Sequence, residues 1–237
     1  MFKNISISKK IHIPVVLSIV IGLLIAVIVL IRSMDNINKN VKTTQKNSME
    51  LILNLKYEKK FAIGLTNAIN LSFNKSIING LKENNRTIII NDLKDLSKAF
   101  RENSTFKNIK IHVHTADVHS FIRLWNLKKY GDDLSSFRET INEVKRIKKA
   151  LKSFEIGRAG LVLRGIAPII DNKKYLGSVE FIQGLNSVSR TLEKQGLHYI
   201  TVMDEKYLDI ATKLKTAKTL FSHYKLVTKK GAIMSIL

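Results

Sequence analysis

The longest uninterrupted apolar run of the chain extends from Ile13 to Ile31 and contains no charged residue. Lysines precede this run closely, and Arg32 follows it directly. A helix rises about 1.5 Å per residue, so a helix of this length is just sufficient to cross a hydrocarbon core of roughly 30 Å. No small-residue cleavage pattern follows the run, which argues against a cleaved signal peptide. The pattern therefore predicts a single uncleaved transmembrane helix over residues 13–31.

The charges around this predicted span indicate its orientation. Lys3, Lys9 and Lys10 lie before it, and the positive-inside rule would keep residues 1–12 in the cytoplasm. Arg32 and Lys39 follow the span closely and weaken the argument, but the short N-terminal flank agrees with it. We therefore expect a single-pass protein of the inner (cytoplasmic) membrane with its body in the periplasm. The body has no cysteine, so its stability must come from an apolar core.

Beyond the span, apolar residues recur at near-heptad spacing, as at Met34, Ile37, Val41, Leu51 and Leu55. This spacing predicts one long helix, or two helices in line, over residues 33–83. Such a helix would be longer than one small domain is wide. We therefore expect it to pack both on its own domain and on a second copy of the chain, as a homodimer.

Residues 84–190 combine helical and strand patterns. The pair Asn84-Asn85 breaks the helix, and the alternation of Ile109, Ile111 and Val113 with polar residues marks a half-buried strand. Turn residues and apolar periodicity predict a hairpin, three further strands and three helices. The remaining strands are expected at 119–125, 153–156, 161–169 and 175–183, and the helices at about 92–101, 134–149 and 186–194. The sum is an α+β fold with a mainly antiparallel, PAS-like sheet.

Residues 191–237 resemble the start of a second module that is not finished. A strand is expected over 197–203 and a helix over 205–215. The sequence does not tell whether residue 237 is a natural end or a truncation.

The formal net charge of +21 raises the question of nucleic-acid binding. Lys and Arg are scattered along the chain without a dense block, and a membrane anchor argues further against this role. There is no phosphate-binding glycine loop, nucleophile elbow or H-E-x-x-H motif. We therefore expect no nucleic-acid partner, no enzymatic activity and no cofactor.

An ordered series of short motifs runs from His112 to Gly184. It consists of His112-x-His114, Ser120-Phe121-x-Arg123-x-Trp125, Gly131-Asp132-Asp133-Leu134, Phe137-Arg138, Glu155-x-Gly157-Arg158-x-Gly160-Leu161, Arg164-Gly165-x-x-Pro168-Ile169 and Gly177-Ser178-x-Glu180-Phe181. The series is similar to the extracytoplasmic double Cache sensory domains of bacterial methyl-accepting chemotaxis proteins and sensor kinases. It covers roughly a third of the chain well and is more specific than any of its single motifs.

The resemblance implies a periplasmic sensor of small molecules that works as a dimer. Its first module lies far from the membrane and usually holds the ligand, and its second module lies close to the membrane. A return transmembrane helix and a cytoplasmic signalling part would follow, and neither is found here. A chemoreceptor is our first expectation. A histidine kinase, a cyclase-type receptor and a non-signalling membrane-anchored interaction protein are the alternatives.

Arg123 is the first candidate for recognition of a small polar ligand. It is expected on one strand face between Phe121 and Trp125, where a guanidinium could bind a carboxylate bidentately while the rings exclude water. Trp125 could also stack on a ligand. The alternative is an arginine that stacks on core aromatics or pairs with a structural carboxylate.

A second set of charged residues could share this role. Arg164 and Glu180 are expected near the middle of adjacent strands, where they either pair with each other or face the ligand. Arg138 and Arg158 lie beside loops, and Glu155 could be a partner of either. The predicted ligand-binding residues are Phe121, Arg123, Trp125, Arg138, Glu155, Arg164 and Glu180. The arginines favour an anion, whereas Glu155 and Glu180 could equally recognise an amine.

His112 and His114 share one strand face, with Asp117 and His119 close in the same hairpin. Histidines at this spacing could bind zinc or nickel. We interpret them instead as the solvated polar face of a hairpin and expect no metal.

Overall fold

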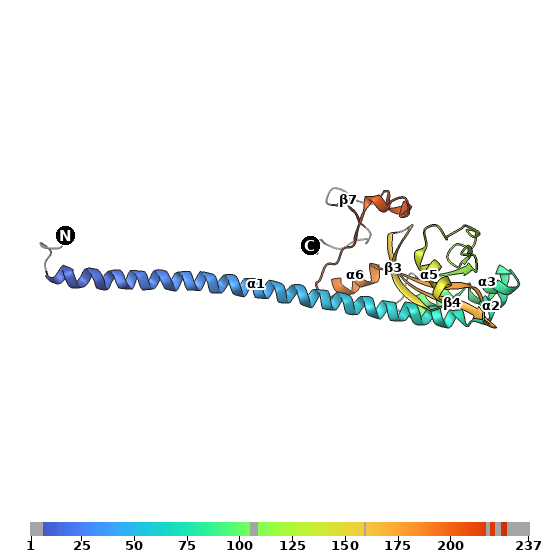
Figure 1. The fold of residues 1–237 in the computed structure, drawn as a ribbon, viewed down its shortest axis with the longest axis horizontal. Helices are drawn as coiled ribbons and strands as arrows, with labels where there is room; N and C mark the ends of the chain where they lie inside the picture. The colour runs from blue at the N-terminus through green and yellow to red at the C-terminus, as the bar shows by residue number, and fades with distance from the viewer. Residues whose placement is uncertain (1–6, 105–108, 159, 217–218, 221–223, 227–237) are drawn as a thin grey trace. The chain divides into compact units, whose positions relative to one another are not determined.

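The computed structural model describes residues 7–104, 109–158, 160–216, 219–220 and 224–226. The chain divides into two compact units, residues 1–54 and residues 55–237. From Ile7 onward the first unit is helical and belongs to helix α1, which spans Ile7–Ser72 and continues into the second unit (Figure 1). The second unit contains all the strands and every candidate site residue.

The N-terminal part of α1 carries the apolar run. Its large side chains are exposed from Ile11 to Ile31, and the most apolar 18-residue window has a mean hydropathy of 3.2 with none of it buried. Among the described residues, α1 is the one helix long and apolar enough to cross a membrane. A bilayer would cover an apolar surface of this kind.

The expected helix over residues 33–83 is two helices. Helix α1 ends at Ser72, and α2 follows at Lys75–Lys82. Asn74 separates them because its side chain accepts a hydrogen bond of 2.9 Å from the Ile77 backbone N–H and caps α2.

Two further short helices follow instead of the one predicted for about 92–101. Asn85 caps α3, Arg86–Leu93, and the chain turns again before α4, Leu96–Asn103. Asn84 has a positive φ of 49°, which explains the break that the Asn-Asn pair predicted.

The central sheet has five antiparallel strands in the order β2-β1-β5-β4-β3. The bounds are β1 Ile109–Thr115, β2 Ser120–Arg123, β3 Leu151–Gly157, β4 Gly160–Asp171 and β5 Lys174–Gly184. The expected hairpin and the three further strands are therefore confirmed. The α+β, PAS-like fold class is confirmed with them.

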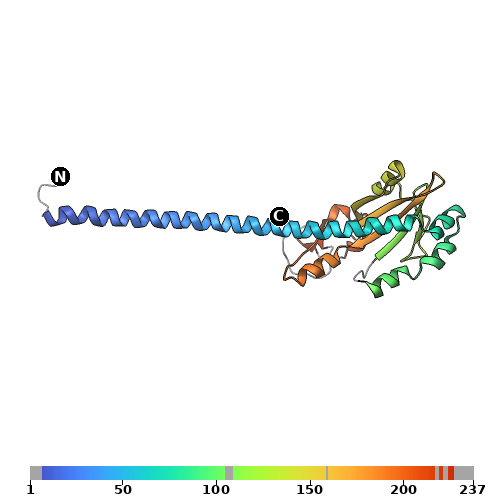
Figure 2. The ribbon, with the colours of Figure 1, turned by 90° about the horizontal axis from the view of Figure 1, so that it is seen from below.

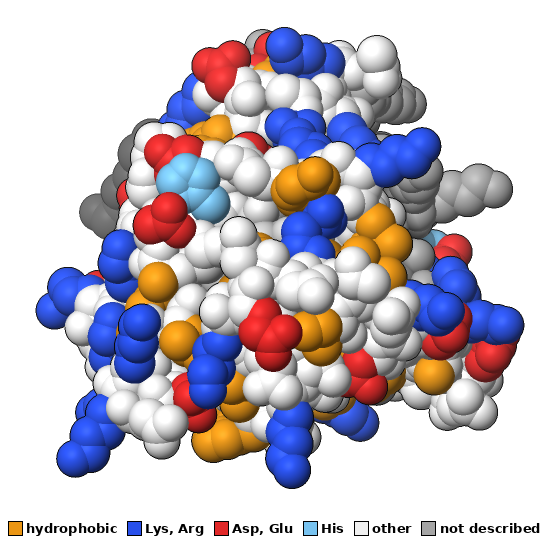
Figure 3. All heavy atoms as spheres, turned by 90° about the vertical axis from the view of Figure 1, so that its right-hand side faces the viewer, with side chains coloured by type: hydrophobic (Ala, Val, Ile, Leu, Met, Phe, Trp, Pro, Cys, Tyr) orange, Lys and Arg blue, Asp and Glu red, His pale blue; other side chains and the backbone are white. Residues whose placement is uncertain are grey.

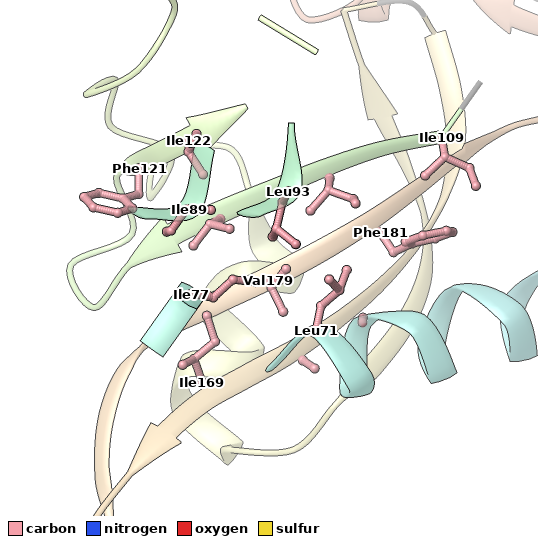
Figure 4. Packing of buried hydrophobic residues seen from close by; sticks show 14 residues of the cluster. Leu71, Ile77, Ile89, Leu93, Ile109, Phe121, Ile122, Ile169, Val179 and Phe181 are labelled. Atoms are coloured by element: carbon pink, nitrogen blue, oxygen red, sulfur yellow. The ribbon is translucent and has the colours of Figure 1, made fainter. Parts of the chain in front are cut away.

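One face of this sheet is apolar and packs against helices. Side chains from the end of α1, from α2 and α3, and from β1, β4 and β5 form the largest core cluster. In Figure 4, Leu71 and Ile77 point from the helices towards the sheet, where Val179 and Phe181 extend from strand β5. The last part of α1 runs along the sheet (Figure 2). Period-two alternation produces this face, because every second strand residue points to the same side.

The opposite face is polar and is covered by helix α5, Glu139–Ile147, and by the loop before it. Helix α5 begins five residues later than predicted. Asp133 accepts a hydrogen bond from the Ser135 backbone N–H in a turn, and Leu134 is buried in the small cluster beneath α5. These contacts keep the chain non-helical up to Arg138.

Helix α6, Asn186–Glu193, agrees with its prediction. The predicted strand over 197–203 shrinks to β6, Val202–Asp204. The predicted helix over 205–215 is wrong, since only two 3-10 turns form there, η1 Glu205–Tyr207 and η2 Thr212–Leu214. Burial of Ala211 and Leu214 against Met203 favours this compact loop over a regular helix.

A small second sheet accompanies these turns. Its strands β6, β7 (Thr219–Leu220) and β8 (Tyr224–Leu226) are arranged in the order β6-β8-β7. Ile156 of β3 packs against the buried cluster around Met203. The segment that contains η2 is therefore joined to the edge of the five-stranded sheet.

Candidate functional site

The polar face of the main sheet contains a pocket of about 520 Å³. Its walls come from all five strands of the main sheet, from the loop between β2 and α5, and from the segment around η2. Trp125 and Phe137 contribute aromatic surface, and both side chains are partly exposed. The volume is within the range of small-molecule sites in proteins, about 300–1,000 Å³.

Arg123 lines this pocket but is held by a neighbour. Its guanidinium donates two hydrogen bonds to the carboxylate of Asp132, at 2.6 and 2.7 Å, and a third to the Lys129 carbonyl at 3.0 Å. These hydrogen bonds and the arginine's charge lower the pKa of Asp132 from 3.8 to about 2. Arg123 therefore forms the structural ion pair that was the alternative to direct ligand binding.

Glu180 is the centre of a buried charge network. Its side chain is completely buried, and its Oε1 accepts hydrogen bonds from Arg138, at 2.5 Å, and from Arg164. Glu155 bridges the same two arginines, with its Oε2 2.9 Å from Arg138 Nε and 3.0 Å from Arg164 Nε. Charge pairs of this kind are needed at such depth, since a buried unpaired charge is costly.

This network shows whether Arg164 and Glu180 pair with each other or face a ligand. Arg164 and Glu180 pair with each other, as expected for two central strand residues. Burial raises the pKa of Glu180, but the charges of Arg138 and Arg164 outweigh it and hold that pKa well below 4.5. Glu180 therefore remains ionised, and its Oε1 is already occupied by the two arginines.

The two histidines of β1 are buried and not solvated. His112 is 3 % exposed and His114 is 0 % exposed, so the interpretation of a solvated hairpin face is wrong for both. The face that they share is the polar face beneath α5 and its loop, which a single sequence did not reveal. His119, by contrast, is partly exposed and pairs with Asp117, whose carboxylate lies 3.1 Å from its Nδ1.

Phe121 does not lie on the same face as Arg123 and Trp125. The register between β1 and β2 shifts at Val113/His114, so that His112 faces Arg123 while His114 faces Ser120. This bulge turns Phe121 into the helix-side core cluster, away from the pocket. The prediction that these three residues share a face is therefore wrong for Phe121.

The pocket lining has a strong excess of positive charge. Seven lining side chains are Lys or Arg and only two, Asp132 and Asp209, are acidic. Within the described ranges, Lys110, Lys129, Arg158 and Lys213 form no ion pair with a carboxylate, although all four line the pocket.

Two of these lysines have perturbed pKa values. Burial lowers the pKa of Lys110, and the charges of Lys213 and Arg164 lower it further. Burial and Arg158 likewise lower the pKa of Lys129. Cations that are crowded in this way create a positive potential in the pocket. Only Arg158 among the four was considered from the sequence, because isolated lysines carry no pattern.

On the face in Figure 3, Lys and Arg side chains are spread among acidic and apolar ones and do not form one patch. This distribution agrees with the scatter seen along the sequence.

The model of a protein family described as the double sensory domain of two-component sensor kinases matches residues 58–226. No curated protein matches the chain. The solved structures to which the chain is similar include a domain of a sensory box/GGDEF family protein from Vibrio parahaemolyticus. It is 17 % identical, with 71 % of this chain and 70 % of that chain covered and a TM-score of 0.49.

Two further structures are the sensor domain of a histidine kinase and the sensory domain of a chemoreceptor. The sensor domain of the histidine kinase DctB of V. cholerae is 13 % identical, with 67 % and 65 % covered and a TM-score of 0.42. The sensory domain of the chemoreceptor Tlp3 of Campylobacter jejuni is 10 % identical, with 71 % of each chain covered and a TM-score of 0.43. The family model spans most of the chain and includes the whole polar pocket, so the chain belongs to the double Cache family of sensory domains.

Proposed function

We propose that this chain is the extracytoplasmic sensing region of a membrane-anchored bacterial signalling protein, and that it binds a small organic anion in the pocket on the polar sheet face. The observation that carries this proposal is the group of four lining cations, Lys110, Lys129, Arg158 and Lys213, without carboxylate partners among the described residues. An anion that enters the pocket would gain several charge-assisted hydrogen bonds.

An amine is the less favoured ligand. The two glutamates that could have recognised it are occupied by Arg138 and Arg164. Trp125 and Phe137 would cover the apolar part of an organic anion.

The pocket also supports a route for the signal. Thr212 and Lys213 contribute to its wall, and the Lys213 backbone N–H donates a hydrogen bond of 2.9 Å to the Arg158 carbonyl. A ligand held between Arg158 and Lys213 would draw the segment around η2 towards the main sheet. A two-state shift of this kind would pass to the membrane through α1, which packs on the other face of the same sheet.

We propose the following arrangement around the membrane. Residues 1–12 are cytoplasmic, 13–31 span the inner membrane, and 33–83 form the periplasmic helical region. Residues 84–190 form the first sensory module and 191–237 begin the second, with two copies joined along the helices. Positive charges on the short N-terminal flank and the apolar surface of α1 support this arrangement.

Three outputs remain candidates: a chemoreceptor, a histidine kinase and a cyclase-type receptor. The motif series suggested a chemoreceptor, while the family description names sensor kinases. The non-signalling alternative, a membrane-anchored interaction protein, predicts a sheet interior without a pocket, so the pocket of about 520 Å³ weakens it.

A thermal-shift titration of the full chain in detergent tests the proposal. The probes are mono- and dicarboxylates, phosphate and sulfate, with amines and amino acids as comparison. A ligand that binds the folded form raises the melting temperature as its concentration passes its Kd. We expect organic anions to give a dose-dependent rise and simple amines to give none.

Charge-removing variants then locate the site. Arg158→Gln and Lys129→Gln should each weaken anion binding roughly tenfold or more, as expected for loss of a charged hydrogen bond of about 1.5–3 kcal/mol. Lys128→Gln is the matched control, since Lys128 is exposed beside Lys129 and does not line the pocket. Equal anion affinity in Arg158→Gln and wild type would remove this pocket from consideration.

A further inference from the structure

Beside the pocket, three buried side chains bring together atoms that could bind a metal ion, namely two imidazole nitrogens and one carboxylate oxygen. His112 Nδ1 lies 3.4 Å and His114 Nε2 lies 3.6 Å from the same oxygen, Glu180 Oε2. All three ligand atoms lie within 4.8 Å of one another, and all three side chains are buried. The three residues come from the neighbouring strands β1 and β5, where His112 and Glu180 are paired directly.

These distances are long for hydrogen bonds and short enough for a metal site. An N–H donor usually lies about 2.7–3.2 Å from an oxygen acceptor. In a tetrahedral site with bonds of about 2.0–2.1 Å, two ligand atoms lie about 3.4 Å apart. His114 Nε2 and Glu180 Oε2 have no hydrogen-bond partner among the described residues. Two buried polar atoms left in this way need a partner that the polypeptide does not supply.

The outer nitrogen of each histidine is held by a serine. His112 Nε2 is 2.8 Å from Ser120 Oγ, and His114 Nδ1 is 2.9 Å from Ser178 Oγ. If each outer N–H donates to its serine, the lone pairs of both inner nitrogens point towards Glu180. Metal-binding histidines typically have their second nitrogen fixed in this way.

The neighbouring arginines are placed so that one oxygen of Glu180 stays open to the two histidines. Arg138 and Arg164 both bind the other oxygen, Glu180 Oε1, which leaves Oε2 ionised and unoccupied by them.

We propose that His112, His114 and Glu180 form a binding site for a divalent transition metal ion of the zinc type. Two imidazoles and one carboxylate suit Zn²⁺, Co²⁺ or Ni²⁺, whereas Mg²⁺ and Ca²⁺ require mainly oxygen ligands. His112 also lines the pocket, which gives the ion a way in and leaves room for a water molecule or an anion as a further ligand. Unlike the hairpin site considered from the sequence, this site contains neither Asp117 nor His119.

The test uses the metal alone and the full chain, without a histidine tag, in detergent after treatment with a chelator. We expect ZnCl₂ to raise the melting temperature progressively, with one Zn²⁺ bound per chain by calorimetry, and MgCl₂ to have no effect. Co²⁺ should give visible absorption bands of a site with nitrogen and oxygen ligands, and Zn²⁺ should abolish them. Absence of Zn²⁺ binding in wild type overturns the proposal.

Variants separate this site from adventitious binding. His114→Gln should abolish the effects of both ions, and Ser178→Ala should weaken Zn²⁺ binding by about 10–100-fold because it removes only the serine partner of His114. His119→Gln is the matched control, since His119 is a partly exposed histidine of the same hairpin. Unchanged Zn²⁺ affinity in Ser178→Ala and His114→Gln, or its loss in His119→Gln, would place the ion elsewhere.

Ser178→Ala keeps the proposal testable if His114→Gln does not fold. No organic anion enters any of these measurements. A failure of the metal site therefore leaves the proposed sensing function untouched, and the reverse also holds.

Discussion

At the scale of single residues, we expect Glu180 to contribute more to stability than the exposed charges of the body, because it is fully buried and pairs with two buried arginines. Glu180→Gln would leave Arg138 and Arg164 buried with Glu155 as their remaining carboxylate partner. We expect a loss of about 3–5 kcal/mol in the free energy of unfolding, which is typical of breaking a buried charge pair.

Urea denaturation of the full chain measures this loss. Glu143→Gln is the control, because Glu143 pairs with Arg146 on the exposed face of α5. Such surface pairs contribute about 0–1 kcal/mol. Similar losses in the two variants would mean that the buried network does not hold the sheet face together.

The Arg123–Asp132 pair predicts a dependence on pH. The Asp132 pKa falls from 3.8 to about 2 on folding, so the unfolded chain binds more protons in this range. The stabilisation is fully present above about pH 4 and is lost as the pH falls towards 2. Asp132→Asn removes it, so the stability difference between wild type and this variant should shrink between about pH 5 and pH 2.5. Denaturant midpoints at both pH values check this, and a constant difference would contradict it.

At the scale of elements, the backbone of helix α1 lies directly against the backbone of strand β4 at Gly165. A Cβ added to Gly165 of β4 would overlap the backbone of Gly64 and Leu65 in α1. Here the missing side chain lets helix and strand backbones meet.

Gly165→Ala should therefore separate α1 from β4 and destabilise the body by about 1–3 kcal/mol or more. Gly184→Ala is the control, since a Cβ at Gly184 meets no atom within 4 Å. Thermal unfolding followed by circular dichroism compares the two variants. A melting temperature unchanged by Gly165→Ala would show that the contact is not needed.

Elements differ in how far the sequence predicts them. The strands of the main sheet follow from apolar periodicity and from turn residues, because both are local signals that need no knowledge of partners. The bulge that turns Phe121 into the core, and the 3-10 turns over 205–215, depend on contacts with distant residues. The same limit applies to the site. Arg164 and Glu180 could be paired from their strand positions, whereas the buried pair of histidines appears only once α5 covers them.

At the scale of the whole molecule, the anchor and the sensing unit make a joint prediction about topology. The chain contains no cysteine, so single cysteines report on their own positions without background. If residues 1–12 are cytoplasmic and the body is periplasmic, Ser8→Cys and Lys145→Cys lie on opposite sides of the inner membrane. Lys145 is exposed on α5 and lies outside the pocket, so its replacement should not disturb the fold.

A thiol reagent that cannot cross the inner membrane should label Lys145→Cys in intact cells, and Ser8→Cys only after the membrane is permeabilised. Labelling of Ser8→Cys alone would place the body in the cytoplasm. The pocket would then sample internal metabolites, and the proposal of an extracytoplasmic sensor would fail even if anions bind.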